Sequence, residues 1–229
     1  GTRGPVTLRI GEVVNLVTAR NITADLQGDY PWTEDNPLLL TNVKVETLGG
    51  KITMQQLRMP QHDPALLRVD NISSSELISA VNPKQFAMSG PVSGALPFWL
   101  DNEKWIIKDG WLTNPWPMTL RIDKDTADAI VKDNMVAGAA INWLRYMEIS
   151  RSWTRINLDN LGELTMQATI KGTSRVDGKS SSVNLNYTHD ENVFTLWRSL
   201  RFGDNLQTWF EQHAAIPGLR SSTGKESEE

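Results

Sequence analysis

The sequence predicts a mainly β protein, an extended antiparallel assembly with helices clustered toward the C-terminal end. Through most of residues 1–122, apolar and polar side chains alternate with a period of two, as they do in strands. Dipeptides typical of tight turns, such as Gly49-Gly50 and Asp177-Gly178, separate some of these stretches. Runs of strands without regularly alternating helices argue against an α/β architecture with a parallel sheet.

Alternation places the strands of the first half. The first strand is expected from about Glu12, with Val14, Leu16, Thr18 and Arg20 in alternation. The others are expected at Asn21–Leu26, Leu38–Glu46, Lys51–Met59, Leu66–Ile72, Gln85–Ser89, Ser93–Leu100, Lys104–Lys108, Trp111–Thr113 and Met118–Ile122. Residues 30–37 have the composition of a loop. A change of phase between Met54 and Leu57 predicts a bulge near Gln55-Gln56. Asp109-Gly110 predicts a turn, and Pro115 and Pro117 exclude a central strand there.

Helices are expected where the period changes to 3.6. A short capped helix covers Ser73–Val81, and a second begins at Asp123 with Ala127, Ile130, Val131 and Met135 on one face. A third follows, with Ala137, Ala140, Ile141, Leu144 and Met147 on its apolar face. Strands return at Glu148–Leu158, Glu163–Lys171 and Ser182–His189. Two amphipathic helices then carry Leu196 and Trp209, before a disordered tail over 215–229.

Composition excludes several classes of protein. The 229 residues contain no Cys, so the chain has no disulfide framework, thiolate metal site or cysteine nucleophile. A net charge of −4 without a basic block argues against a nucleic-acid partner. The uncharged stretch Gln85–Leu100 contains two glycines and two prolines, which a transmembrane helix would not tolerate. Because the chain starts with Gly and not Met, we expect a fragment of a longer or processed protein.

No motif points to catalysis, a metal or a cofactor. His62, His189 and His213 lack metal-ligand spacing, and the sequence has no nucleophile elbow of the form G-x-S-x-G. His189-Asp190-Glu191 is better explained as a strand end followed by a helix N-terminus, where acids favour the helix dipole. Gly178-Lys179-Ser180 lacks both the glycine spacing and the strand-to-helix setting of a phosphate loop. We therefore expect no enzymatic activity and no cofactor.

Tryptophan is unusually common, with nine residues against five Phe and three Tyr. Trp99, Trp105, Trp111 and Trp116 fall close together and are interleaved with prolines. Three interpretations remain open for this cluster. The side chains fill a core, they form a platform on which sugars stack, or they line an apolar groove or its wet boundary.

The second half of the chain resembles the C-terminal region of the YdbH family. The resemblance rests on an ordered series of short runs, namely Ser89–Pro97 with its Gly94-Ala95-Leu96-Pro97, Trp105–Leu112, Val183–Asn192 and Leu196–Arg201. It covers about residues 77–214. The run Pro115-Trp116-Pro117 departs from the Pro-Gly type of loop usual in the family, which puts the local geometry there in question.

This resemblance implies a fold, a place and a function. YdbH proteins belong to the AsmA-like group with TamB and YhdP, which form a long curled sheet, or β-taco, around an apolar groove. Residues 1–122 would then be a β-groove segment, and 123–214 a YdbH-type C-terminal segment with helices and closing strands. The resemblance further implies a Gram-negative periplasmic protein anchored in the inner membrane, carrying phospholipids to or from the outer membrane. The implied partner is a small outer-membrane lipoprotein similar to YnbE.

The alternation selects candidate residues for such a groove. They are Val43, Val45, Ile52, Met54, Leu67, Val69, Leu96, Phe98 and Ile107. Trp99, Trp105, Trp111 and Trp116 are candidates for its rim, and Val183, Leu185 and Tyr187 for an edge strand that pairs with the partner. Core packing is the alternative for each apolar residue. Two other functions stay open, a Trp-rich module that binds envelope glycan and an adaptor that only captures a partner.

Overall fold

A computed structural model describes residues 4–13, 18–81, 86–125, 127–128 and 145–195. Strands dominate it, and α1 (Ser74–Val81) follows the fifth strand. The strands are β1 (Val6–Val13), β2 (Ala19–Gln27), β3 (Leu38–Thr47), β4 (Gly50–Met59), β5 (Ala65–Ser73), β6 (Phe86–Ser89), β7 (Pro91–Phe98), β8 (Trp105–Thr113), β9 (Met118–Ile122), β10 (Tyr146–Asp159), β11 (Glu163–Val176) and β12 (Lys179–Asn192).

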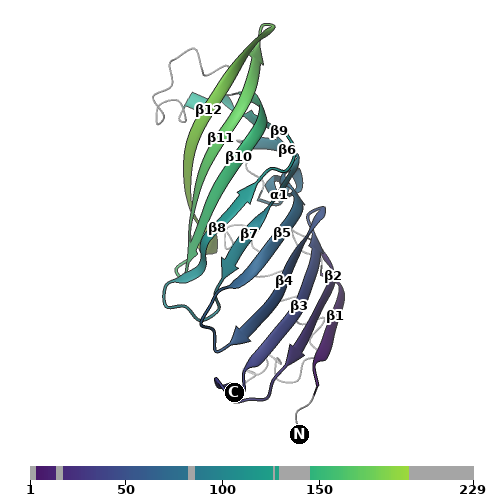
Figure 1. Ribbon diagram of the computed structural model, residues 1–229. Coiled ribbons are helices and arrows are strands. Elements are labelled where there is room, and N and C mark those ends of the chain that lie inside the picture. Colours follow the sequence, from purple (N-terminus) through teal and green to yellow (C-terminus); the bar gives the residue numbers. More distant parts are fainter. Residues whose placement is uncertain (1–3, 14–17, 82–85, 126, 129–144, 196–229) are drawn as a thin grey trace, which may run out of the picture.

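All the strands belong to one open antiparallel sheet (Figure 1). Its main path runs β1-β2-β3-β4-β5-β7-β8-β10-β11-β12. Off this path, β9 pairs with the first residues of β10 and with β6. β1 and β12 stand at opposite ends and do not pair with each other, so the sheet is not a closed barrel. The predicted fold class, a mainly antiparallel open sheet, is confirmed, and β8 and β9 from the expected first segment pair with β10 from the second.

Asparagine and aspartate residues bend the sheet from within its strands. Asn21, Asn42, Asn71 and Asp109 adopt left-handed backbone conformations with φ between 49° and 55°. Strand register shifts beside them in the β2–β3, β5–β7 and β7–β8 pairs. Asn and Asp tolerate this conformation better than other side chains with a Cβ. Such bulges increase the local twist, so they contribute to the curling of the sheet.

The expected turn at Asp109-Gly110 is therefore wrong. β8 continues through it from Trp105 to Thr113. The backbone N–H of Asp109 donates to Oδ1 of Asn157 on β10, at 2.8 Å. This contact holds the left-handed residue as a bulge in a continuous strand.

Other boundaries also differ from the expectation. A single strand is expected from Glu12 to Arg20, but Glu12 lies near the end of β1, which ends at Val13, and Arg20 lies near the start of β2, which begins at Ala19. That expectation is wrong, and residues 14–17 lie outside the described residues. The β3–β4 turn is Leu48-Gly49, both with positive φ, because Gly50 already pairs with Thr47. Met147, expected on a helix, lies in β10 opposite Leu120.

Several predicted features are present. Exposed Gln55 and Gln56 separate buried Met54 from buried Leu57, so the change of phase occurs where the sequence places it. β4 nevertheless stays in register with β3 throughout, and its recorded pairing with β5 ends at Met54. A helix starts after Asp123, whose carbonyl accepts from the N–H of Ala127 at 3.0 Å. The remainder of that helix, and most or all of the other three helices expected after it, lie outside the described residues.

Two apolar clusters pack against the same face of the sheet. The larger consists of Met118, Leu120, Ile122, Ala127, Met147, Ile149 and Leu185. Its residues come from β9, from the first half of β10 with which β9 pairs, from β12, and from Ala127. The smaller consists of Met54, Leu57 and Ala65, with Leu40, Val43, Leu67 and Phe98 packed around it. The larger cluster is the main core and holds the β12 end of the sheet together.

Asn114 holds β10 at the point where this strand changes partner. β10 pairs with β9 over Tyr146–Ile149 and with β8 from Trp153 onward. The Asn114 Oδ1 accepts from the N–H of Ser152 at 2.6 Å, and its Nδ2 donates to the carbonyl of Trp116 at 2.9 Å. The side chain is buried, and both of its polar ends have partners. The predicted break after Thr113 is thus a loop that is tied back to β10.

We predict that Gly94→Ala destabilises the sheet. A Cβ at Gly94 would lie 1.9 Å from the carbonyl oxygen of Trp111 on β8, so β7 and β8 would have to separate. The expected loss is about 1–3 kcal/mol in the free energy of unfolding, measured by urea denaturation. Gly11→Ala in β1 is the matched control, because its Cβ would meet open space. Equal stability of the two variants would contradict this account of the close strand contact.

Candidate functional site

One face of the sheet carries an almost continuous layer of apolar side chains. Residues that are directly opposite each other in adjacent strands lie on the same face. One such row joins Val6, Leu26, Leu40 and Leu57 from β1 to β4. Leu57 packs in one cluster with Ala65 on β5. From Ala65 the row continues across the next strands through Phe98, Ile107, Leu158 and Leu164. We call this side the apolar face; at about 4.8 Å per strand the row extends roughly 40 Å.

All the groove candidates selected from the sequence lie on the apolar face. One row consists of Val43, Met54, Leu67 and Leu96, and a second of Val45, Ile52 and Val69. Phe98 and Ile107 are opposite each other in the row described above. Met54 and Val69 are buried, and the other candidates are half-buried. The structure thus brings these residues together on one surface, as their alternation requires.

The same face includes residues that the sequence reading did not select. They are Val6, Leu8 and Ile10 on β1, Ile22 and Leu26 on β2, Leu40, Leu57, Leu112, Ile156, Leu158, Leu164 and Met166. Most of them alternate as clearly as the selected set, so the period of two could have found them. Leu40 and Leu57 could not be found in this way, because the irregularities at Asn42 and Gln55 change the phase between them and Val43 or Met54.

The opposite face is polar, and we call it the outer face. A typical row runs from Lys44 through Thr53 to Arg68. Near β1, the carboxylate of Asp25 accepts from Nδ2 of Asn42 at 3.0 Å and from the hydroxyl of Thr7 at 2.8 Å. The hydrogen bonds from Asn42 and then Thr7 lower the pKa of Asp25. The two faces therefore differ sharply in polarity, as in a sheet with one side in water.

The apolar face changes character along the sheet. At the β12 end it is covered, and Met147, Ile149 and Ile122 are almost fully buried in the main core. Along β3–β8 the side chains are mostly half-buried. On β1, Val6, Leu8 and Ile10 are 57 %, 44 % and 40 % exposed. The face is thus packed at one end and open to water at the edge strand of the other.

Polar groups occupy the apolar face at the end of β12. Tyr187, His189 and Glu191 lie on this face because their partners in β11 are Ala168, Met166 and Leu164. The Tyr187 hydroxyl is 3.2 Å from Nδ1 of His189, and Nε2 of His189 is 3.0 Å from Glu191 Oε2. Asp190 projects to the outer face, so the three consecutive residues His189–Glu191 do not form a cluster. Among the described residues, no group of three or more His, Asp or Glu side chains could hold a metal ion.

The four tryptophans expected at the rim lie in different surroundings. Trp99 and Trp105 flank the β7–β8 loop, where the N–H of Trp99 donates to the carbonyl of Ile106 at 2.8 Å. Lys104 and Lys108 place their ammonium groups 4.8 and 4.4 Å from the Trp105 ring centroid. Trp116 is 65 % exposed in the loop at the other end of β8. Trp111 differs from the expectation, because it lies in mid-strand on the outer face, opposite Ala95 and Arg155.

β12 has the position expected of a partner-binding edge. In the part of the chain that the structure describes, it pairs only with β11 and ends the strand order. Leu185 is buried in the main core, and Val183 and Tyr187 pack against it. These side chains hold β12 on the sheet, so a partner strand at this edge would meet the β12 backbone and not them.

A pocket lies on the surface away from the apolar face. It has a volume of about 930 Å³, lies at the β3–β4 turn and α1, and is lined among others by Arg20, Lys44, Asp70 and Glu76. Its lining carries both charges and is separate from the apolar rows. In the described residues, no helix has the length and apolar character needed to cross a membrane.

The chain is similar in sequence to a family model and to a curated protein. The family model described as YdbH-like, intermembrane phospholipid transport protein YdbH, matches residues 1–215. The Probable phospholipid transport protein YdbH of Escherichia coli (strain K12) is 78 % identical over 229 residues, which cover this whole chain and 26 % of that relative. The chain therefore spans about a quarter of the length of this relative. No solved structure matches the chain.

Proposed function

This chain belongs to the YdbH-like family, and on that basis we propose that it is the C-terminal module of a protein that carries phospholipids between the inner and outer membranes. The apolar face is the path of the acyl chains in this proposal. The full-length protein would span the periplasm and be anchored in the inner membrane. The module itself carries out no catalysis and needs no cofactor, because moving a lipid breaks no covalent bond.

The observation that supports this function most strongly is the almost continuous apolar row from Val6 on β1 to Leu164 on β11, in which packing of Leu57 with Ala65 joins β4 to β5. A soluble protein normally covers such a surface, since exposing apolar area to water costs roughly 25 cal/mol per Å². Here the main core covers only the β12 end, and Val6 at the other edge stays largely exposed. Acyl chains would cover the remaining half-buried surface and remove it from water.

The shape of the sheet suits a mobile lipid. Leu96 and Ile107 occupy the space where a side chain at Gly110 would project, so apolar groups cover the backbone at this point of the face. Rows of Val, Leu and Ile offer no hydrogen bond that would hold a lipid at one place. A lipid can therefore slide along the face with little change in free energy, while its headgroup stays in water beyond the strand ends.

The proposed partner is a small outer-membrane lipoprotein similar to YnbE, which adds a strand to β12. An edge strand offers unpaired N–H and C=O groups, and these can continue the ladder with another chain. β12 is 14 residues long and is firmly held by Leu185 in the main core. A strand added here would lengthen the sheet next to the packed end of the apolar face.

We predict that a photo-crosslinking amino acid at Val45 or Ile52 captures phospholipid in cells. Both positions lie on the half-buried part of the apolar face and are opposite each other in β3 and β4. The measurement is mass spectrometry of lipid attached to the full-length protein after irradiation.

Lys44 is the matched control for this experiment, because it is the neighbour of Val45 in sequence and projects from the outer face. Lipid adducts at Val45 and Ile52, with few at Lys44, are the expected result. Adducts mainly at Lys44 would overturn the assignment of the lipid path to the apolar face.

We also predict that a photo-crosslinking amino acid at Thr188 on β12 captures the lipoprotein. Thr188 and Gln167 are opposite each other in β12 and β11, and both are exposed on the outer face. Only Thr188 would touch a strand added at the edge, because Gln167 lies one strand further inside, about 4.8 Å away. Adducts at Thr188 and not at Gln167, detected by immunoblot of a tagged lipoprotein, are expected. Equal adducts at the two positions, or none at either, would contradict edge pairing at β12.

A further inference from the structure

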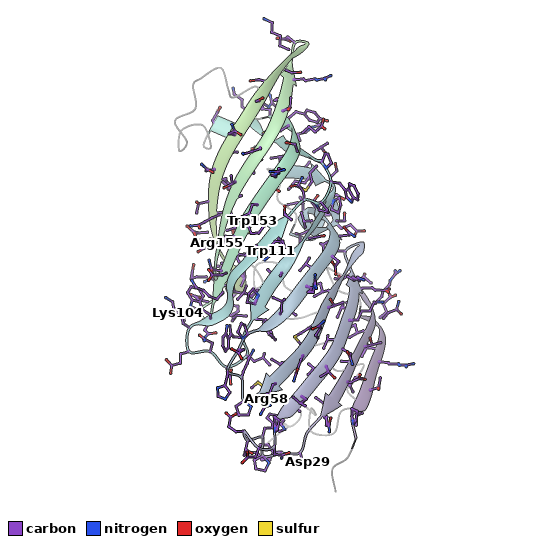
Figure 2. All side chains as sticks on the ribbon, viewed as in Figure 1. Asp29, Arg58, Lys104, Trp111, Trp153 and Arg155 are labelled. Atoms are coloured by element: carbon purple, nitrogen blue, oxygen red, sulfur yellow. The ribbon has the colours of Figure 1, made fainter. Side chains whose placement is uncertain are left out.

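A pair of stacked tryptophans stands on the outer face, away from both apolar clusters. The rings of Trp111 on β8 and Trp153 on β10 have centroids 4.8 Å apart and an angle of 9° between their planes. Trp153 is 48 % exposed. Its cross-strand partners, Thr113 and Thr169, are polar. The two indoles, labelled in Figure 2, therefore form an aromatic platform that is exposed at Trp153 and half-buried at Trp111.

Positively charged side chains flank the platform on β10 and β11. Arg155 is directly opposite Trp111, and Figure 2 shows it beside the two rings. Arg151 and Lys171, opposite each other in β10 and β11, lie on the same face. Among the described residues, none of these three cations forms an ion pair. The side chains of β10 and β11 on this face, from Arg151 to Asn157 and from Thr165 to Lys171, include no carboxylate, although the whole chain has a net charge of −4.

The neighbouring polar side chains suit a sugar. Gln167 is opposite Arg155, and Thr169 is opposite Trp153. Amide and hydroxyl groups both donate and accept hydrogen bonds, as sugar hydroxyls and acetamido groups require. The C–H face of a sugar ring is apolar and packs on an indole, while a guanidinium binds a carboxylate through two parallel hydrogen bonds.

The geometry points to a second binding site, in which the outer face of β8, β10 and β11 binds an acidic glycan through Trp153, Arg155 and the Arg151–Lys171 pair. Arg151 and Arg155 are four residues apart on one strand, which is roughly 13 Å. That spread fits a polymer with recurrent carboxylates better than a single compact headgroup. In the envelope location of the proposed function, on which this choice of ligand rests, peptidoglycan is such a polymer. The site would hold the module against the cell wall while the opposite face carries lipid.

The test is co-sedimentation of the purified 229-residue chain with isolated Gram-negative sacculi. We expect the unmodified chain to pellet, and Trp153→Ala and Arg155→Gln each to weaken binding about tenfold, the effect of losing one strong contact. Added salt and amidation of the sacculus carboxylates should also release the protein, because the contacts are partly ionic. Circular dichroism and the thermal unfolding midpoint establish that each variant is folded.

Trp116→Ala is the matched control, because Trp116 is an exposed tryptophan outside the platform. Binding that is retained by Trp116→Ala and weakened in Trp153→Ala and Arg155→Gln supports the site. Three outcomes would overturn it: no pelleting of the unmodified chain, equal loss in Trp116→Ala, or binding of lipopolysaccharide micelles in place of sacculi. Lipid crosslinking at Val45 is unaffected by Trp153→Ala if the two faces act separately, so failure of this site leaves the proposed transport function standing.

Discussion

Cross-strand pairing in a sheet with a single apolar face is the constraint on which the rest of the structure depends. Every strand must stay in a register that keeps its apolar residues on the same side, because a slip of one residue would expose them all. Rows such as Val43–Met54–Leu67–Leu96 meet this requirement across four strands. The bulges at Asn42, Asn71 and Asp109 bend the sheet where a flat ladder would run straight, and the apolar rows continue past them.

The same constraint explains why the two ends of the molecule differ. Near β12, side chains of β9 join Met147 and Ile149 of the neighbouring β10, and Leu185, in the main core. Towards β1 the strands continue the same row, but nothing comparable in the described residues covers Val6, Leu8 and Ile10. The main core therefore lies at one end, and the remainder of the face is less covered, as the proposed lipid path requires. The outer face is free of this task and can carry a platform such as Trp111–Trp153.

Local alternation was enough to predict most strands and to place the nine groove candidates on one face, but it could not predict features set by distant partners. Asp109-Gly110 has the composition of a turn, and only the side chain of Asn157 makes it a bulge. Met147 continues a helical spacing, yet its partner Leu120 draws it into β10. The apolar phase of Val6, Leu8 and Ile10 continues through Val14 and Leu16, so no change of pattern marks the end of β1. The stacking of Trp111 on Trp153 joins two strands far apart in sequence and leaves no local signal.

The central claim is that phospholipid occupies the apolar face. Paramagnetic relaxation in the 229-residue chain, caused by a phospholipid with a nitroxide on its acyl chain, tests this claim most directly. Methyl signals of Val45, Ile52 and Leu158 should broaden strongly as the labelled lipid is added. The methyl signal of Ala95, which lies on the outer face opposite Arg68 and Trp111, should broaden less, because the thickness of the sheet separates it from the lipid. Equal broadening on the two faces, or broadening confined to the outer face, would contradict the account.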